Sequence, residues 1–367
     1  MAYFDNASTS LYRPPMVADA MVDAITNLGN PGRGTHTHAL AAARMVFSAR
    51  KTIADFFGTS PMQTVFTSGA TDSLNIAIRG LLRPGEHVIS TVLEHNSVLR
   101  PLHHNGVDVT AVGLTPDIDL DYTGFSRALT PKTVAVVITT ASNVTGLVVD
   151  MDFVCDFCKR HGLLLIVDTA QTAGLLPADT AGVDVLCFTG HKALLGPQGV
   201  GGLCVKNGLS LRPYKVGGTG TDSYSQNQPY QMPEALEAGT LNMPGIAGLS
   251  AGVCYITATG LDKLYATAME FADTFYTEVL RYVQVYCGRP HLPIVALNIG
   301  DYDSVTVEDI LASEYSISAR GGVHCAPKMH TALGTASRGA VRFSFSSFNT
   351  WEDVEQAIKA VNLLARS

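Results

Sequence analysis

Short apolar runs alternate with longer amphipathic stretches between about residues 60 and 205. The runs are rich in Val, Ile and Leu and end in polar residues, whereas the stretches between them repeat their apolar positions with helical spacing. This alternation is typical of a parallel sheet that is covered by helices. The predicted strands are residues 63–67, 87–90, 134–138, 163–167 and 183–188.

The pattern changes after residue 205. Residues 207–245 are rich in Gly, Pro and Ser, which predicts loops that line a site or an interface. A helical pattern then runs from Pro244 to about Val285, and strands and a final helix at residues 351–365 follow it. Because 367 residues exceed what one core usually organises, we expect a large domain of residues 14–245 and a smaller α+β domain of residues 246–367 with residues 1–13.

Composition narrows the class of protein. Hydrophobic residues make up 46% and charged residues 16% of the chain, which describes a well-packed globule. The net charge is −7 and no cluster of Lys and Arg stands out, so we expect no nucleic-acid partner. The N-terminus has no basic region, and no run of about 18 apolar residues occurs, so we expect a cytoplasmic protein without a membrane span.

Neither the cysteines nor the histidines indicate a metal site. The seven cysteines are an odd number in a long chain without a secretory signal, which favours reduced thiols. Cys155 and Cys158 form a C-x-x-C pair in a predicted helix, and no second pair completes a metal site, so helix packing is the better interpretation. The histidines that lack ordered ligand spacing are His36, His38, His103 and His104.

Polar residues at the strand ends carry the candidate chemistry, because ligands of open α/β sheets bind at the carboxyl ends of strands. Asp168 ends one predicted strand, and since a buried carboxylate without a partner is costly, a charged ligand is expected beside it. Lys192 follows another strand and precedes the glycine-rich residues 195–202, where lost hydration lowers a lysine pKa and favours the neutral amine. Taken singly, Asp168 also fits a helix N-cap, and Lys192 also fits a surface lysine.

Two further segments fit a bound cofactor. Residues 67–75 pass from a strand into a helix, whose first N–H groups can bind a phosphate together with the hydroxyl of Thr71. A plain helix cap is the alternative. His95 can stack on a planar ring or transfer a proton. A cofactor that activates amino acids needs a lysine, a carboxylate for its pyridine nitrogen and an anion site, and this sequence offers all three.

Several short motifs occur in order along the chain. They are Glu94-His95-Asn96, Asn143, Asp168-x-x-Gln171, Thr189-Gly-His-Lys192 and Glu237-Ala-Gly-Thr240. Together they resemble the class V aminotransferase-like family of pyridoxal-phosphate enzymes, and the resemblance extends from Asp5-Asn-Ala-Ser-Thr9 to Arg342. It implies the α/β fold of PLP-dependent transferases of fold type I, with a mostly parallel seven-stranded sheet and a smaller α+β C-terminal domain.

Two C-terminal segments narrow the resemblance. Arg320-Gly-Gly-Val-His-Cys-Ala-Pro327 resembles the cysteine-bearing segment of the group II cysteine desulfurases and selenocysteine lyases, and it points to Cys325. A buried structural thiol is the alternative for this residue. Arg342 begins a stretch that resembles the one whose arginine clamps the substrate carboxylate, a role that suits a guanidinium because it binds carboxylates in bidentate fashion.

The resemblance also implies residue roles. Lys192 would hold pyridoxal 5′-phosphate as a Schiff base, Asp168 would pair with its ring nitrogen and Gln171 would bind its ring oxygen. His95 would lie over the ring, and Asn143 would lie near the ring oxygen and the substrate. The implied phosphate ligands are Ala70, Thr71, Thr189 and His191, together with Thr240 from the partner subunit of a homodimer. The segment Arg33-Gly-Thr-His36 resembles a loop that covers the pocket, so His36 is a candidate substrate contact.

The implied reaction converts L-cysteine or L-selenocysteine to L-alanine, with sulfur transfer through a persulfide on Cys325 or with selenium release, and a sulfur-acceptor protein is a further expected partner. Ala70 replaces a more usual threonine and Phe348 stands where tyrosine is common, which leaves the substrate open. The alternatives are a class V aminotransferase, racemase or β-eliminating lyase for another amino acid, and an inactive scaffold with the same fold. No G-x-G-x-x-G opens a helix after a first strand, which argues against a dinucleotide enzyme.

Overall fold

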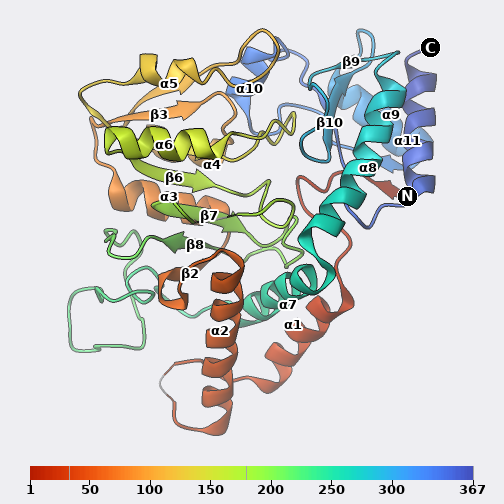
Figure 1. Ribbon diagram of the computed structural model, residues 1–367. Helices are drawn as coiled ribbons and strands as arrows, with labels where there is room; N and C mark the ends of the chain where they lie inside the picture. The colour runs from red at the N-terminus through yellow and green to blue at the C-terminus, as the bar shows by residue number, and fades with distance from the viewer. Residues whose placement is uncertain (33, 179, 367) are drawn as a thin grey trace.

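A seven-stranded sheet forms the centre of the protein in a computed structural model that describes residues 1–32, 34–178 and 180–366 (Figure 1). The strand order is β2-β8-β7-β6-β5-β3-β4, and all neighbouring pairs are parallel except those made by β8. The prediction of a mostly parallel seven-stranded sheet is confirmed. The strands are β2 (Thr64–Thr67), β3 (His87–Thr91), β4 (Asp108–Val112), β5 (Thr133–Thr139), β6 (Leu164–Asp168), β7 (Val185–Thr189) and β8 (Gly201–Val205).

The five predicted strands correspond to β2, β3, β5, β6 and β7, whereas β4 and β8 escaped the sequence pattern. Strand β4 lies at the edge of the sheet and is mostly exposed or half-buried, so it lacks an apolar run. Strand β8 begins with two glycines, which are depleted in strands. A Cβ at Gly201 would lie 2.5 Å from the Phe188 carbonyl oxygen and 2.7 Å from the Gly69 Cα, so this strand needs glycine to pass so close to its neighbours.

Alternate residues of the buried strands face two different cores. In β5, Ala135 and Val137 pack with α3 and α4, whereas Val136 and Ile138 pack with α2, α5, α6 and α7. Strand side chains alternate between faces, so a strand buried on both sides must be apolar at successive positions. This explains why the central strands are continuous apolar runs and not alternating ones. The helices of this part are α1 (Pro15–Asn27), α2 (Thr37–Phe56), α3 (Ala70–Leu81), α4 (Asn96–His104), α5 (Thr123–Ala128), α6 (Met151–His161) and α7 (Met243–Thr259).

A second, smaller core lies beside the sheet and contains both ends of the described chain (Figure 1). Its antiparallel sheet has the order β12-β10-β9, and a separate strand near the N-terminus, β1, pairs with β11 in parallel. Phe4, Phe275 and Phe343 are fully buried there. The boundaries at residues 13 and 245 stay a prediction. The elements are β1 (Ala2–Tyr3), α8 (Leu261–Val279), β9 (Gln284–Val285), β10 (Ile294–Asn298), α9 (Ser304–Tyr315), β11 (Ile317–Ser318), α10 (Pro327–Ala332), β12 (Val341–Ser344) and α11 (Trp351–Leu364).

The predicted helix from Pro244 to about Val285 is wrong in its continuity. Two helices, α7 and α8, meet at an angle of 85° at Gly260, whose φ of 96° ends the first helix. Apolar residues continue on both sides of this corner, so Gly260 itself is the one sign of a break in the local sequence. Among the described residues no single helix is long and apolar enough to cross a membrane, and only the bent pair α7–α8 passes by length and composition.

The C-x-x-C pair lies on α6, as the sequence predicted. Cys158 is buried against the core, and burial raises the pKa of its thiol to about 12. Cys155 is half-buried and packs against the same core. Within the described part of the chain, no group of three or more His, Cys, Asp or Glu residues could hold a metal ion.

Candidate active site

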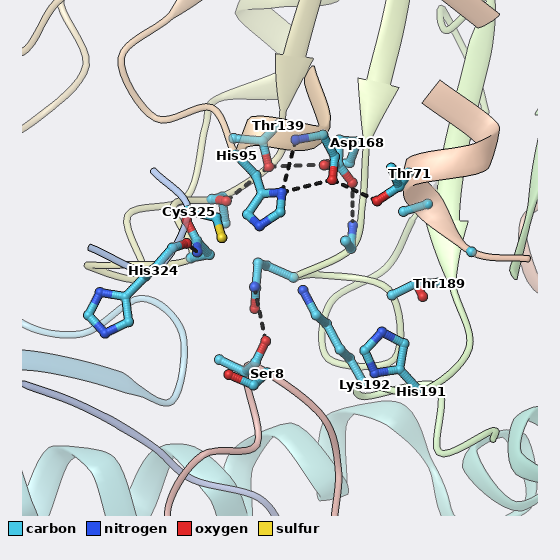
Figure 2. Close-up of a pocket in the computed structure, with 18 of the residues that line it drawn as sticks. Ser8, Thr71, His95, Thr139, Asp168, Thr189, His191, Lys192, His324 and Cys325 are labelled. Carbon is cyan, nitrogen blue, oxygen red and sulfur yellow. Dashed lines mark hydrogen bonds between the residues drawn. The ribbon is translucent and has the colours of Figure 1, made fainter. Parts of the chain in front are cut away.

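A cavity of about 560 Å³ lies at the carboxyl ends of the central strands, where the large sheet meets the smaller core (Figure 2). Segments that follow β2, β3, β5, β6 and β7 line it, together with residues 7–8 and residues 320–325. The candidate residues that line it are Ala70, Thr71, His95, Asn143, Asp168, Gln171, Thr189, His191, Lys192, Cys325 and Arg342. The ends of the central strands bring together the candidates between residues 70 and 192, whereas Cys325 and Arg342 reach the cavity from the smaller core.

Asp168 and Lys192 are the central charged pair of the cavity. Asp168 ends β6, is 3% exposed, and accepts one hydrogen bond from the Ala170 N–H at 2.9 Å. Burial raises the pKa of Asp168, while the nearby charge of Lys192 acts in the opposite direction. Removal from water lowers the pKa of Lys192 to about 8, against the opposing effect of Asp168. The amine is therefore much closer to its neutral, nucleophilic form than an exposed lysine is.

The start of α3 offers an anion site on one wall of the cavity. The helix begins at Ala70, its N-cap is Gly69 with a φ of 148°, and no side chain caps its first N–H groups. These donors, with the helix dipole, suit a phosphate group. Thr71 lies there with its hydroxyl 2.7 Å from that of Ser97, and Thr189 lines the same wall.

His95 caps α4 and is held in one tautomer. Its Nδ1 accepts the Ser97 N–H at 3.1 Å and lies 2.8 Å from the Ser97 hydroxyl, so the ring proton lies on Nε2. Burial, followed by the charges of Lys192, Arg100 and Arg342, lowers the pKa of His95 to about 4. The ring is therefore neutral, and it can stack on a planar group or donate one hydrogen bond without bringing a second positive charge to the site.

Three buried polar atoms of residues that line the cavity have no hydrogen-bond partner among the described residues. They are Nδ1 of His191, Oδ1 of Asn143 and Nε of Arg342. Buried polar atoms normally have partners, so unpaired ones that line a cavity indicate a polar ligand. With the carboxylate of Asp168, the amine of Lys192 and the uncapped start of α3, these atoms fit a phosphorylated pyridine aldehyde.

Glu94 is a buried acid that the sequence reasoning left without a role. It is fully buried; its Oε1 accepts the Thr91 hydroxyl at 2.7 Å and its Oε2 accepts the Thr139 N–H at 2.9 Å. Burial and the nearby Asp168 raise the pKa of Glu94 to about 8, so the group is neutral at pH 7. The carboxyl group thereby ties the end of β3 to the end of β5 beneath the cavity.

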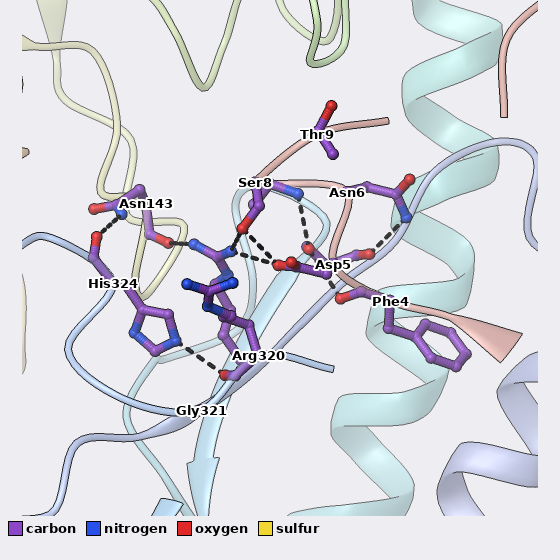
Figure 3. Close-up of polar contacts among 12 residues, drawn as sticks. Phe4, Asp5, Asn6, Ser8, Thr9, Asn143, Arg320, Gly321 and His324 are labelled. Atoms are coloured by element: carbon purple, nitrogen blue, oxygen red, sulfur yellow. Dashed lines mark hydrogen bonds and ion pairs between the residues drawn. The ribbon is translucent and has the colours of Figure 1, made fainter. Parts of the chain in front are cut away.

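Arg342 lies in β12, is 2% exposed and lines the cavity. Its partners Asp5, Ser8 and Asn143 come together there from segments far apart in the chain (Figure 3). Its Nη2 pairs with Asp5 Oδ1 at 2.8 Å and donates to the Ser8 hydroxyl at 2.7 Å, and its Nη1 donates to the Asn143 carbonyl at 2.8 Å. Sequence reasoning used Asp5 and Ser8 only as part of a motif and missed this contact. The acid and the hydroxyl lie three positions apart in a short N-terminal segment, and this spacing was the signal in the sequence that could have indicated a partner for an arginine.

Gln171 and Asn143 make contacts other than those that the resemblance implies for them. The Gln171 side-chain amide donates to the Ala7 carbonyl at 3.3 Å. The Asn143 amide donates to the His324 carbonyl at 2.7 Å, which fixes the cysteine-bearing segment against the large sheet. Each side chain still has its amide oxygen available, so each can accept a hydrogen bond from a ligand.

Cys325 is exposed to the cavity and stands in a constrained turn. His324 and Cys325 have positive φ angles of 48° and 56°, and the Cys325 carbonyl accepts the Asn96 N–H at 2.8 Å. His324 brings no positive charge to this turn. Burial lowers the pKa of His324 to about 3, and its ring is turned away from His95 and Lys192 (Figure 2). The positively charged side chains that line the same cavity as the thiol are those of Lys192, Arg320 and Arg342.

Two candidate residues do not line this cavity. His36 is exposed and caps α2, where its Nδ1 accepts the Ala39 N–H at 3.3 Å, and Arg33 of the same segment lies outside the described residues. Thr240 is exposed and lines a separate hollow. The loop that carries it is anchored by a buried bidentate pair, in which Arg50 binds Glu237 with N–O distances of 2.6 and 2.9 Å.

The sequence model of the aminotransferase class-V family matches residues 2–357. The chain therefore belongs to the aminotransferase class-V family, whose members, like the cysteine desulfurases, are pyridoxal-phosphate enzymes.

Relatives within the family carry a common name. A "Probable cysteine desulfurase" of Methanothermobacter thermautotrophicus is 33% identical over 96% of this chain and 92% of its own length. The apo structure of a cysteine desulfurase from Thermococcus onnurineus NA1 has a TM-score of 0.92 at 29% identity, covering 100% of this chain and 94% of the other. The cysteine desulfurase CsdA from Escherichia coli has a TM-score of 0.87 at 26% identity, covering 99% and 94%. Relatives by sequence and by structure are thus cysteine desulfurases.

Glu94→Gln should stabilise the protein relative to wild type as the pH rises. Between about pH 4.5 and 8 folded Glu94 keeps a proton that the unfolded chain has released, so wild-type stability falls with rising pH across this window. Gln keeps the shape without titrating. The difference in unfolding free energy should therefore grow by about 1 kcal/mol or more between pH 5 and pH 8, measured by urea denaturation. Glu355→Gln, on the exposed side of α11, controls for net charge. A difference that stays constant with pH would show that Glu94 is ionised in the folded protein.

Proposed function

We propose that this chain is a pyridoxal-phosphate-dependent cysteine desulfurase that takes sulfur from L-cysteine, or selenium from L-selenocysteine, and forms L-alanine. The observation that carries the proposal is the presence of Cys325 in one cavity with Lys192, Asp168 and Arg342. An aminotransferase, racemase or lyase uses the lysine, the carboxylate and the arginine but needs no thiol. The names of the relatives support the same choice.

Lys192 is the residue that would hold the cofactor covalently, with Asp168 at its ring nitrogen. The uncapped start of α3 with Thr71, and the free Nδ1 of His191, would receive the phosphate. Neutral His95 would lie against the ring. When bound, the cofactor supplies an electron sink that makes the α-proton of an amino acid removable. The low pKa of Lys192 then allows its amine to accept that proton.

Arg342 and Asn143 are placed to hold the substrate. The guanidinium is already oriented by Asp5, Ser8 and the Asn143 carbonyl, so binding a carboxylate costs little side-chain ordering. Its Nε has no partner among the described residues, and neither has Oδ1 of Asn143. These two atoms are the donor and the acceptor that remain for an amino acid.

Sulfur transfer at Cys325 balances without a further reagent. The Cys325 thiolate attacks the substrate sulfur, an S–S bond forms, and the carbon–sulfur bond of the substrate breaks with its electron pair left on carbon. Protonation of that carbon and return of the α-proton from Lys192 give L-alanine, and the enzyme keeps a persulfide. A sulfur-acceptor protein or a small thiol then takes the terminal sulfur by attack on the persulfide.

A second copy of the chain would complete the site. Thr240 is exposed and lies outside the cavity of its own chain, so a phosphate contact from Thr240 requires a partner. Exposed apolar side chains on the first two helices and the segment before them offer a face for such a partner. They are Leu11, Met16, Ile25, Leu40 and Phe47, which are 44% to 67% exposed.

Borohydride reduction of the protein incubated with pyridoxal 5′-phosphate should attach the cofactor to Lys192 and to no other lysine. Peptide mass spectrometry locates the adduct. The rate of attachment should rise between about pH 7 and pH 9, because the neutral fraction of Lys192 grows through its pKa of about 8. Lys192→Ala should show no reducible adduct, and Lys206→Ala, at an exposed lysine, should behave as wild type. An adduct at a different lysine would refute the assignment.

Cys325→Ala should keep the reducible cofactor and lose the conversion of L-cysteine to L-alanine by about 100-fold or more, because the nucleophile for sulfur is gone. The measurement is alanine, pyruvate and ammonia after mixing with L-cysteine, L-cysteine sulfinate and L-selenocysteine. Cys254→Ala, at an exposed cysteine on α7, is the matched control. Pyruvate and ammonia from wild type in place of alanine would identify a β-eliminating lyase, and full activity of Cys325→Ala would remove the thiol from the reaction.

Leu40→Glu combined with Phe47→Glu should convert a dimer into monomers, because the new carboxylates would be buried without partners. Sedimentation velocity measures the change. Tyr302→Glu, at a similarly exposed aromatic residue near the smaller core, should leave the dimer intact. A wild-type protein that sediments as a monomer at micromolar concentration would contradict the shared site.

A further inference from the structure

A chain of three hydrogen-bonded side chains supports the cysteine-bearing turn from behind. His330, in α10, is fully buried and lies outside the cavity wall. Its Nε2 is 3.3 Å from His324 Nδ1, and its Nδ1 is 2.8 Å from the Thr335 hydroxyl. The two imidazole rings stack with centroids 5.5 Å apart at 25°. At the far end, His324 Nε2 lies 3.0 Å from the Arg320 carbonyl.

The Arg320 carbonyl at the end of this series of side chains fixes the direction of every hydrogen bond in the series. A carbonyl only accepts, so His324 must donate from Nε2 to Arg320. A neutral ring then has Nδ1 as its acceptor, so His330 must donate to it from Nε2. The Nδ1 of His330 in turn accepts from the Thr335 hydroxyl. Burial lowers the pKa of both histidines, to about 3 for His324, which is consistent with neutral rings.

The turn that this chain supports is strained. Left-handed conformations at residues other than glycine cost about 1–2 kcal/mol each, and they persist only where the surroundings hold them. His324 and Cys325 both adopt them, with φ angles of 48° and 56°. The His324 carbonyl accepts a hydrogen bond from the Asn143 side chain, and the Cys325 carbonyl accepts one from the Asn96 N–H. The only side chain of the two that is held by hydrogen bonds to described residues is that of His324.

We propose that His330 is a positioning residue for the Cys325 thiol, acting through the ring of His324. The hydrogen bond from His330 keeps the His324 ring turned away from Lys192 and holds His324 in its left-handed conformation, and this in turn directs the next side chain, that of Cys325, into the cavity that Lys192 lines. Among the described residues His330 makes no hydrogen bond to the thiol, to the cofactor residues or to the carboxylate-binding Arg342. Its effect is therefore confined to the step in which sulfur is attacked, and the inference rests on the proposed desulfurase activity.

The test compares two variants of His330 in two reactions of the cofactor-loaded protein. His330→Leu removes the donor and keeps most of the volume, whereas His330→Gln keeps an N–H donor near the position of Nε2. The first reaction is alanine formation from L-cysteine, which needs the thiol. The second is exchange of the α-proton of L-alanine in D₂O, followed by NMR, which needs the cofactor, Lys192 and Arg342 but not the thiol.

His330→Leu should lower kcat for alanine formation about tenfold, since small misplacements of a reacting group cost one to two orders of magnitude. KM for cysteine and the exchange rate should stay within about twofold of wild type, because substrate binding does not involve the turn. His330→Gln should recover kcat to within about threefold of wild type. Parallel loss of both reactions in a folded His330→Leu, or unchanged kcat, would overturn the role of His330.

Two further measurements make the outcome decisive. If His330→Leu does not fold, Thr335→Val replaces it in the test, because this variant removes only the hydroxyl that orients His330. Thr335→Val should lower kcat for alanine formation about threefold and leave the exchange rate unchanged. Equal loss of both reactions, or an unchanged kcat, overturns the proposal. A wild-type protein that exchanges the alanine α-proton but forms no alanine from cysteine would contradict the proposed desulfurase activity. A wild type active in both reactions, with His330→Leu unaffected, contradicts only the positioning role.

Discussion

The removal of charged groups from water at the carboxyl edge of the sheet is the constraint on which the rest of the structure depends. Asp168, Lys192 and Arg342 all lie where burial works against their charged forms. Each is tolerated because another charge or a main-chain dipole faces it, and each is left with capacity for a ligand. Burying these charges costs free energy as long as they lack ligand partners. Binding an anionic cofactor or a zwitterionic substrate supplies those partners and is therefore favourable.

The neutral imidazoles around the cavity follow from the same constraint. Burial and neighbouring positive charges hold the pKa values of His95, His191 and His324 well below that of a free histidine. Positive charge in the cavity is thereby left to Lys192, Arg320 and Arg342. The histidines act as fixed donors, acceptors and planar surfaces, because a hydrogen bond at one ring nitrogen fixes the role of the other.

The cavity is closed by contacts between segments that are far apart in the chain. Asp5 pairs with Arg342 across 337 positions, and Asn143 joins the same guanidinium to the His324 carbonyl. The carboxylate-binding arginine and the sulfur-accepting turn therefore share one support, so the group that holds the substrate and the group that attacks it are fixed relative to each other. Fixing two reacting groups in this way supplies much of the rate enhancement available to an enzyme.

The sequence alone determined the wound parallel sheet, because strands that are buried on both faces must be continuous apolar runs, and it determined most of the residues at its carboxyl edge, because the ends of parallel strands meet there. It could not show β4 or β8, whose edge position and glycines hide the strand pattern, nor the 85° corner at Gly260, because apolar residues continue on both sides of it. Only the tertiary structure decided how Asp5 orients Arg342, why Glu94 is neutral, and which way His324 points. Those properties depend on burial and on partners distant in the chain, and neither can be predicted from the residues next to each group in the sequence.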